Sequence, residues 1–379
     1  MLKTNIIIIS IIVFAIYFFS IEVNGNERNK VCLKTSYDIY KENFMSQDGR
    51  IIDFDKNNIT TSEGQSYMLL RSLLMDDQKT FELVWGWTKN NLQRDDKLFA
   101  WLWGKNPSGQ YQILDENSAA DGDVDTAFAL LLAHKKWNNY CYLEEALPII
   151  QSIWNKETRQ IGDNLVLMPG VNQATDSKTE INPSYFAPYA FRLFQKYDEI
   201  HDWDLLVDSS YYYLSEIGKK TQTHLPTNWF LIENGQIVLE DSPKSDFSYD
   251  AIRVFARVYL DYCQTKDKRA LPILKQSEFF VNKWKKDKIL YTNYQANGQL
   301  RDKNKFIGSM AILIPTINIY DKKTAAEMYK SQIVQSFESE AYWSSENDYY
   351  GKNLSWFAYY LYNKNPINCT NPKQKREKS

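Results

Sequence analysis

The feature that most constrains the fold of this chain is a repeat of paired helical segments. The first segment of each pair begins near residue 63, 123, 183, 250 or 306, and the steps between these starts are 60, 60, 67 and 56 residues. A period of this length, built from helix pairs, is typical of repeat architectures in which each pair buries its apolar face against its neighbours. We therefore expect a succession of helical hairpins.

Each predicted pair is joined by a short turn that contains Asp or Asn, which are favourable N-cap residues for the second helix. The pairs are 63–74 with 79–90, 123–137 with 143–155, 183–196 with 205–217, 250–263 with 270–283, and 306–319 with 325–335. The turns contain Asp76-Asp77, Asn138-Asn139, Asp202, Asp267 and Asp321. Two further helices, at 36–44 and 351–362, bring the count to about twelve. Six hairpins closed into a ring predict an all-α (α/α)6 toroid with an inner and an outer layer.

The long loops between the pairs are predicted to carry small β-hairpins. Asn234-Gly235 stands between the apolar segments 230–233 and 236–239, and this dipeptide favours a type I′ turn. Asn297-Gly298 is a weaker signal of the same kind.

The two ends of the chain are predicted to lie outside the folded domain. Residues 1–25 combine Lys3, an apolar run over 6–19 and the small-residue sequence Val23-Asn24-Gly25, which is the pattern of a signal peptide. The same leader, uncleaved, could serve as a membrane anchor through residues 6–21, and either interpretation predicts an exported protein. Residues 26–365 contain no Pro/Gly/Ser linker and are predicted to form one domain, followed by a polar basic tail at 366–379.

Charge and histidine content exclude several classes of function. The chain has 45 Lys+Arg against 47 Asp+Glu, and this balance lacks the basic footprint of a nucleic-acid-binding protein. Its three histidines are far apart in sequence, which excludes HExxH zinc sites, and no GxSxG motif occurs. We expect no cofactor and no metal.

The four cysteines, Cys32, Cys141, Cys263 and Cys369, form no CxxC motif, so zinc-ribbon and redox interpretations fail. Export permits disulfides, and four cysteines allow three full pairings. A bridge between Cys32 and Cys369 would tie the two ends of the folded part together.

The starts of the first helices carry most of the polar residues of interest. Glu63 follows Thr61-Ser62, and Ser62 with Gln65 matches a capping box. Asp121-Gly122-Asp123-Val124-Asp125 opens the second pair, Asn182-Pro183-Ser184-Tyr185 the third, and Tyr249-Asp250 the fourth. Because the first helices of a toroid run in one direction, their N-termini should meet on one face.

This geometry would bring Glu63, Asp121, Tyr185 and Asp250 together. Two alternatives weigh against a functional interpretation. Any one of these acids could simply complement a helix dipole. Residues 121–125 also resemble a calcium loop, although an EF-hand requires Gly at its sixth and Glu at its twelfth position, where this chain has Thr126 and Leu132. Paired carboxylates are what glycoside hydrolysis needs, and an aromatic content of 15% suits the stacking of sugar rings.

Five sequence blocks resemble those of glycoside hydrolase family 8, in the order of that family and over roughly residues 35–362. They are Thr61-Ser62-Glu63-Gly64-Gln65-Ser66-Tyr67, Ala100-Trp101-Leu102-Trp103-Gly104, Asn117-Ser118-Ala119-Ala120-Asp121-Gly122-Asp123, Asn182-Pro183-Ser184-Tyr185-Phe186-Ala187-Pro188 and Tyr249-Asp250-Ala251-Ile252-Arg253. The resemblance is greatest to the bacterial cellulases associated with cellulose or exopolysaccharide export.

The resemblance implies a role for six residues. Glu63 would be the general acid and Asp250 the general base of an inverting reaction. Asp121 would hold the sugar at the cleavage point, with Tyr185 and Arg253 lining the same site, and Trp101 would stack on a sugar ring. Ala120 stands where the family usually has Ser or Thr, and Thr126 replaces an apolar residue, so the shape near Asp121 is less certain to match.

One physical requirement tests these roles. A helix N-terminus lowers the pKa of a carboxyl group, which suits Asp250 as a base and opposes Glu63 as an acid. Burial, or the nearby charge of Asp121, would have to raise the pKa of Glu63.

We therefore predict a secreted, monomeric endo-glycosidase that hydrolyses a β-1,4-linked glucan or a related bacterial exopolysaccharide. The alternatives are a toroid polysaccharide lyase and a non-catalytic saccharide-binding matrix protein.

Overall fold

The computed structural model describes residues 27–171, 178–305, 307–334 and 348–363. The predicted leader and tail lie outside these residues, and so do Cys369 and the side chain of Cys32. Cys141 is a free cysteine at the surface, so none of the three full pairings is present, and the bridge between Cys32 and Cys369 falls outside the described residues. Within the described part of the chain, no helix combines the length and the apolar character needed to cross a membrane.

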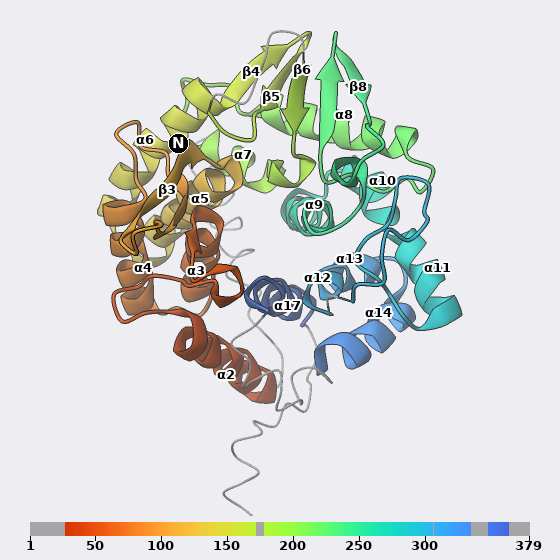
Figure 1. Cartoon of the computed structure of the whole chain (residues 1–379), viewed down its shortest axis with the longest axis horizontal. Helices are drawn as coiled ribbons and strands as arrows, with labels where there is room; N and C mark the ends of the chain where they lie inside the picture. Colours follow the sequence, from red (N-terminus) through yellow and green to blue (C-terminus); the bar gives the residue numbers. More distant parts are fainter. Residues whose placement is uncertain (1–26, 172–177, 306, 335–347, 364–379) are drawn as a thin grey trace, which may run out of the picture.

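The helices form two concentric layers (Figure 1). The inner layer consists of α3 (Ser62–Leu74), α5 (Ala120–Trp137), α7 (Pro188–Phe194), α9 (Ile252–Thr265), α12 (Ile307–Ala311) with α13 (Ile314–Ile317), and α17 (Tyr349–Tyr362). The outer layer consists of α2 (Glu27–Phe44), α4 (Gln78–Asn91), α6 (Tyr140–Glu157), α8 (Asp204–Lys220), α10 (Ala270–Lys275) with α11 (Glu278–Asp287), and α14 (Lys322–Tyr329). Successive inner helices pack against one another, and each outer layer helix packs against its inner partner. The predicted (α/α)6 toroid is confirmed.

The sixth hairpin is made from the two ends of the described chain. The last inner helix, α17, packs against α2, the first outer helix. Arg71 of α3 closes the ring, because its Nη1 donates to Oδ1 of Asn353 on α17 at 3.1 Å and its guanidinium lies 3.8 Å from the ring centroid of Tyr40 on α2.

Burial separates the two layers and explains their sequences. On α5, every residue from Ala120 to Ala133 is buried, which is the pattern of a helix surrounded by protein on all sides. On α6, the buried apolar residues form a stripe along one face: Tyr142, Leu143, Ala146, Ile149, Ile150 and Ile153. Spacings of three and four residues place such a stripe on the side that faces the core. The core therefore lies mainly between the two layers.

Several predicted helices are shorter than expected because they are interrupted. Pro188 has no N–H and disfavours helical geometry at Ala187, so the segment predicted at 183–196 divides into a 3-10 turn, η2 (Pro183–Tyr185), and α7. Segment 270–283 divides into α10 and α11, and segment 306–319 divides into α12 and α13. Segment 325–335 comprises most of α14 and a π-helical turn, η4 (Lys330–Val334). Two further 3-10 turns are η1 (Phe54–Lys56) and η3 (Pro243–Ser245).

The N-cap predictions hold for three of the joining turns. Asp77, Asn139 and Asp321 each accept a hydrogen bond from a backbone N–H of the following helix, at 3.1, 3.0 and 3.0 Å. The turn at Asp202 differs, because α8 follows Trp203 and has no side-chain cap. At Asp267 the carboxylate accepts from the N–H of Arg269, but α10 itself also has no side-chain cap.

The predicted capping box at the start of α3 is wrong. Thr61 is the N-cap, and its hydroxyl accepts from the N–H of Gly64 at 3.1 Å. Ser62 is the first residue of the helix, and its hydroxyl lies so close to Gly122 that a side chain there would clash. Gln65 instead accepts from the N–H of Ile51 and donates to Thr88, because both groups are buried beside it and need partners.

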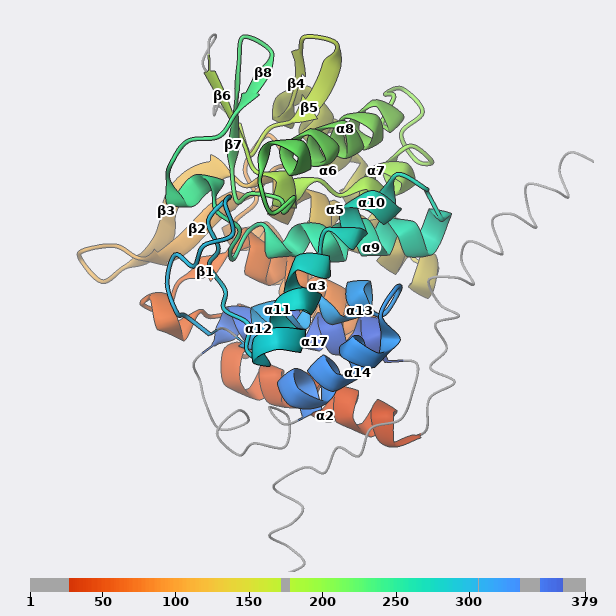
Figure 2. The same ribbon diagram turned by 90° about the vertical axis from the view of Figure 1, so that its right-hand side faces the viewer.

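Three small antiparallel sheets lie in the loops. They are β1 (Thr60–Thr61) with β2 (Ala100–Lys105) and β3 (Tyr111–Ser118), β4 (Thr158–Ile161) with β5 (Asn164–Leu167), and β6 (Lys178–Ile181) with β7 (Phe230–Glu233) and β8 (Gln236–Val238). Strands β4 to β8 stand together beyond the helices at the top of Figure 2. Asn234 and Gly235 have φ values of 48° and 73°, which confirms the predicted type I′ turn, whereas Asn297-Gly298 is spanned by a single bridge between Tyr294 and Leu300.

The strands also position the starts of the inner helices. β1 leads directly into α3, β3 into α5, and β6 into η2. The pairing of each of these strands therefore helps to fix the position of the helical turn that follows it. In β1, Thr61 pairs with Leu102 of β2, two positions before Glu63.

Candidate active site

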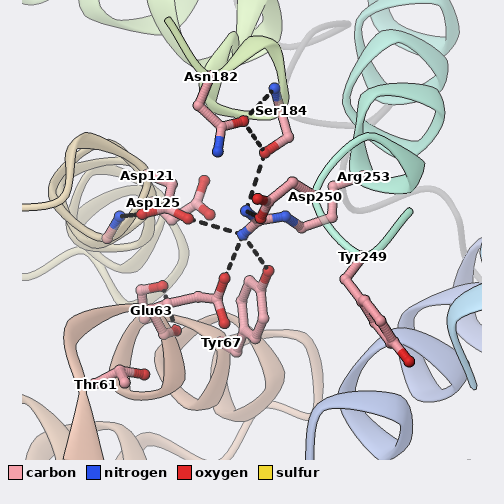
Figure 3. A network of polar contacts seen from close by, with 12 residues as sticks. Thr61, Glu63, Tyr67, Asp121, Asp125, Asn182, Ser184, Tyr249, Asp250 and Arg253 are labelled. Atoms are coloured by element: carbon pink, nitrogen blue, oxygen red, sulfur yellow. Dashed lines mark hydrogen bonds and ion pairs between the residues drawn. The ribbon is translucent and has the colours of Figure 1, made fainter. Parts of the chain in front are cut away.

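The starts of the inner helices converge on one guanidinium group, that of Arg253 (Figure 3). Its Nη1 donates to the carboxylate of Glu63, to Oδ2 of Asp121 at 2.8 Å and to the hydroxyl of Tyr67 at 3.3 Å. Its Nη2 donates to Oδ1 of Asp250 at 2.8 Å. Residues from α3, α5 and the α9 region thus meet at a single cation, although 187 positions separate Glu63 from Asp250 in the sequence.

A fourth element reaches the same cation. Nη2 of Arg253 donates to the hydroxyl of Ser184, in η2, at 2.9 Å. Asn182 caps η2 by accepting from the N–H and the hydroxyl of Ser184, at 3.0 and 2.7 Å. Pro183 follows as the first residue of the turn, where its missing N–H costs nothing. The Asn-Pro-Ser segment therefore aims one hydroxyl at Arg253.

The three acids occupy slightly different local positions. Glu63 lies in the first turn of α3, as predicted, and Asp121 is the second residue of α5, which begins three positions before the predicted start at 123. Asp250 precedes the first residue of α9 by two positions, so it lies just outside the first turn where it was expected. Its carbonyl accepts from the N–H of Arg253 at 3.0 Å, and Asn228 holds the adjacent N–H of Ala251 at 3.1 Å.

Exposure divides these residues into two kinds. The side chains of Glu63 and Asp250 retain 22% and 34% of their surface, whereas those of Asp121 and Arg253 retain 3% and 5%. Glu63 and Asp250 are therefore accessible to a molecule that enters from solvent. Asp121 and Arg253 lie behind them as an almost completely buried ion pair.

One cation among three carboxyl groups leaves an excess of negative charge. Burial raises the pKa of Glu63 to about 7; Arg253 opposes this shift, and the charges of Asp121 and Asp250 add to it. Burial likewise raises the pKa of Asp121, again against the effect of Arg253. The requirement set by the sequence is met, since burial and the charge of Asp121 outweigh the helix N-terminus at Glu63.

Aromatic side chains complete the surroundings of Asp250. The ring of Tyr185 lies 5.6 Å from the guanidinium of Arg253 and packs edge-to-face on Trp229, with centroids 6.2 Å apart. Nε1 of Trp229 donates to Oδ2 of Asp250 at 3.2 Å. Burial raises the pKa of Tyr185 well above its usual value, so its hydroxyl stays protonated.

Sequence reasoning assigned no role to three of these residues. Tyr67 and Ser184 lie inside blocks that were singled out, at positions four and two residues after Glu63 and Asn182, and helical spacing could have identified Tyr67 as a neighbour of Glu63. Trp229 belongs to no block, and its contact with Asp250 follows only from the tertiary fold.

In the described part of the chain, Trp101 is not part of the hydrogen-bonded network around Arg253. It is half-buried on β2, and its side chain hydrogen-bonds to Asp115 on the neighbouring strand. Among the described residues, no hydrogen bond or ring contact joins Trp101 to Arg253 or its partners. Its predicted stacking on a sugar ring stays a prediction.

Helix α17 contacts the segments that carry both exposed acids. The hydroxyl of Tyr350 donates to the carbonyl of Tyr249, next to Asp250, at 2.8 Å. The hydroxyl of Tyr349 lies against Gly64, next to Glu63, where any side chain would overlap with it. The last helix of the ring therefore braces both sides of the site.

Comparisons with known proteins agree with this geometry. The family model for glycosyl hydrolases family 8 matches residues 16–364. An endoglucanase of Escherichia coli strain K12 is 34% identical over 233 residues, which cover 59% of this chain and 61% of that protein. Endoglucanase A of Acetivibrio thermocellus is 28% identical over 314 residues, which cover 80% of this chain and 61% of that protein. The matched regions thus span about three fifths of these relatives.

Solved structures extend the similarity over more of the chain. The endo-1,4-D-glucanase of Vibrio fischeri ES114 is 28% identical and superposes with a TM-score of 0.76, covering 86% of this chain and 93% of that one. A cold-adapted family 8 xylanase, 18% identical with a TM-score of 0.69, covers 89% of this chain and 91% of that one and shares the fold. Because the family model covers most of the sequence, and four of the five sequence blocks of that family meet around Arg253, this chain belongs to family 8 of the glycosyl hydrolases.

Proposed function

We propose that the chain is an inverting endo-glucanase that cleaves β-1,4-linked glucan, with Glu63 as the general acid and Asp250 as the general base. The observation that carries this proposal is the network of Arg253, in which three carboxyl groups share one cation and the two exposed ones face solvent. The endoglucanase names of the relatives support a glucan as the substrate class.

In the proposed reaction, Glu63 starts protonated. With a pKa of about 7, it holds a proton under mildly acidic to neutral conditions and can transfer it to the glycosidic oxygen as the bond breaks. The carboxylate that remains is then stabilised by Nη1 of Arg253. The same residue therefore has a proton to give and a cation to receive the charge left behind.

Asp250 would remove a proton from the attacking water. Arg253 and Trp229 donate to its two oxygens and fix its orientation, and a carboxylate keeps further lone pairs for a water molecule. Inversion needs room for that water, so the two carboxyl groups should stand ~6.5–9.5 Å apart rather than the ~5–5.5 Å of a retaining site. The guanidinium between Glu63 and Asp250 is consistent with such spacing, and the separation itself stays a prediction.

Asp121 and Tyr185 have supporting roles in this proposal. Asp121 keeps Arg253 in place and raises the pKa of Glu63 through its charge. Its direct contact with a sugar, implied by the family resemblance, would involve the 3% of its side chain that is exposed. Tyr185 presents a protonated hydroxyl and a ring beside Arg253.

Hydrolysis of soluble cellulose derivatives, mixed-linkage glucan and xylan would test the function. An endo-glucanase lowers the viscosity of a glucan long before reducing ends accumulate, and Glu63→Gln serves as the inactive control. Proton NMR should detect the α-anomer first in fresh product from a β-linked glucan, because inversion changes the configuration. Initial β-anomer would contradict Asp250 as base, unsaturated products would indicate a lyase, and release of only mono- or disaccharide would contradict the endo mode.

We also propose that residues 1–25 export a single catalytic domain at 26–365, either as a cleaved signal peptide or as an anchor. N-terminal sequencing of the protein recovered outside the cytoplasm would distinguish the two. A mature N-terminus near residue 26 would support cleavage, and an intact leader in the membrane fraction would support an anchor.

A further inference from the structure

Two buried carboxyl groups face each other directly behind the active site. Asp123, in the first turn of α5, and Glu157, the last residue of α6, have no exposed surface. Oδ1 of Asp123 accepts from the N–H of Phe99 at 2.7 Å, and Oε1 of Glu157 accepts from the hydroxyl of Ser118 at 2.6 Å. The two side chains contact each other, and Oδ2 of Asp123 and Oε2 of Glu157 have no other hydrogen-bond partner in the described part of the chain.

Two carboxylates in such a position cannot both stay charged, because no donor stands between them and water is excluded. A single proton converts their contact into a hydrogen bond between a carboxylic acid and a carboxylate. Two charged groups face the pair from the packed elements: Asp121 of α5, which favours the protonated form, and Arg94, which opposes it. Burial raises the pKa of Glu157 to about 8 and that of Asp123 well above its usual value.

The pair also joins several segments around the start of α5. The hydroxyl of Ser118 accepts from the N–H of Val171 at 3.0 Å while it donates to Glu157. The carbonyl of Glu157 accepts from the N–H of Met168 at 2.7 Å, and the next residue, Pro169, accepts from the N–H of Ala120 at 2.9 Å. Asp121 follows immediately in the chain.

We propose that Asp123 and Glu157 share one proton and act as positioning residues that hold Asp121 opposite Arg253. The proposal rests on the proposed function, because Asp121 belongs to that site. It adds two residues that do not touch Arg253 and that the family resemblance did not assign.

Amide substitutions test the positioning role. Asp123→Asn or Glu157→Gln places an N–H donor where the shared proton would lie, so either single variant should keep a kcat close to native. In the double variant, two NH2 groups face each other while the amide oxygens keep their bonds to the N–H of Phe99 and the hydroxyl of Ser118, and turning either amide breaks or reverses one of those bonds. We expect its kcat to fall about tenfold or more, because small displacements at a reacting centre are costly. A double variant as active as the singles, or single variants as inactive as the double, would overturn the proposal.

Asp261→Asn is the matched control for the loss of a buried carboxylate. Asp261 has no exposed surface and is bound by Arg192 at 2.9 Å and Tyr211 at 2.6 Å, away from Arg253. This variant should lower the unfolding midpoint without lowering kcat. A double variant that merely resembles it, unstable but with native kcat, would indicate a structural role alone.

The shared proton can be observed without any enzymatic activity. In a Glu63→Gln background, which removes the carboxyl whose pKa is raised to about 7, infrared spectra should contain a carboxylic-acid carbonyl band at pH 7 that disappears by pH 10. The band should be absent when Asp123→Asn or Glu157→Gln is added. Absence of the band from the background protein, or its persistence in both variants, would overturn the shared proton. Because this readout needs no substrate, it still decides the matter if no polysaccharide is cleaved.

Discussion

Two arginines on α9, one helical turn apart, stand in contrasting surroundings. Arg253 binds three carboxyl groups from different parts of the chain. Arg257 binds one, that of Asp125, through two parallel hydrogen bonds of 2.8 Å, and shares it with the hydroxyl of Tyr189. Asp125 lies four residues after Asp121 on α5, so the two arginine–aspartate pairs form successive layers between the same two helices.

The difference between the layers is one of charge balance. In the layer of Arg257, one cation meets one anion, and the side chains of Arg257 and Asp125 are almost fully buried, at 6% and 3% exposure. In the layer of Arg253, the same type of cation meets three acids, so an excess of negative charge must be relieved by protonation. A balanced pair holds two helices together, whereas in the unbalanced one burial, with the charges of Asp121 and Asp250, raises the pKa of Glu63 to about 7.

The largest effect is expected from Glu63→Gln in the layer of Arg253. The amide keeps the size of the side chain but has no proton to give to the leaving oxygen, so activity should fall about 10²-fold or more. Initial rates on a soluble glucan measure this loss, and the melting temperature should be no lower than that of the native chain. Native activity in this variant would exclude Glu63 as the acid.

The same carboxylate-to-amide change in the layer of Arg257 should lower the stability of the folded chain. Asp125→Asn leaves the guanidinium of Arg257 buried without its counter-charge, which typically costs about 3–5 kcal/mol of unfolding free energy. Urea denaturation at neutral pH measures the loss. If Asp125→Asn and Glu63→Gln lowered stability equally, the distinction between the two layers would be wrong.

The pH dependence of stability should reveal the unbalanced charge. The pKa of Glu63 is raised in the folded protein, so its stabilising effect is complete below its ordinary value of 4.5 and is lost as pH rises through about 7. Compared with the native chain, Glu63→Gln should therefore gain on the order of 3 kcal/mol between pH 4 and pH 8. Denaturation curves of both proteins across this range give the difference, and a difference that does not change with pH would contradict the raised pKa.

The same titration should shape the activity. Because the proton of Glu63 is lost near pH 7, kcat/KM should decline above that pH and approach a tenfold loss per pH unit. A decline that begins well below or well above pH 7 would indicate another group as the acid.

The smallest effect concerns the packing beside Glu63. Gly64→Ala would force the new methyl group into the hydroxyl of Tyr349, so α3 or α17 must shift, and activity should fall about tenfold. Gly86→Ala, in the middle of α4 with no atom near the added group, is the control and should stabilise the helix by up to about 1 kcal/mol. Equal activity in the two variants would show that α17 does not brace Glu63.

Much of the fold could be predicted from the sequence because helices are local. The period near 60 residues predicted the hairpins, and Asp77, Asn139 and Asp321 cap the helices that follow them. The breaks within the predicted helices were harder to predict from the sequence. Pro188 could have indicated the break before α7, but the division between α10 and α11 has no comparable signal in the chain.

The capping box failed for a reason that local sequence does not contain. Ser62 and Gln65 have the right types and spacing, yet Gln65 is buried and is taken up by Ile51 and Thr88, which lie 14 and 23 residues away. A buried amide satisfies whichever partners the tertiary fold provides. The cap then falls to Thr61, which lies one position earlier.

The sequence by itself determined which acids stand at the starts of helices, and the direction of the ring implied that they would meet. Only the tertiary structure decided that Arg253 joins them, that Trp229 orients Asp250, and that Glu63 combines access to solvent with a pKa of about 7. The physical reason is that a pKa depends on burial and on charges within a few ångströms, and here the charges of Asp121, Asp250 and Arg253 come from positions 58 to 190 residues away from Glu63.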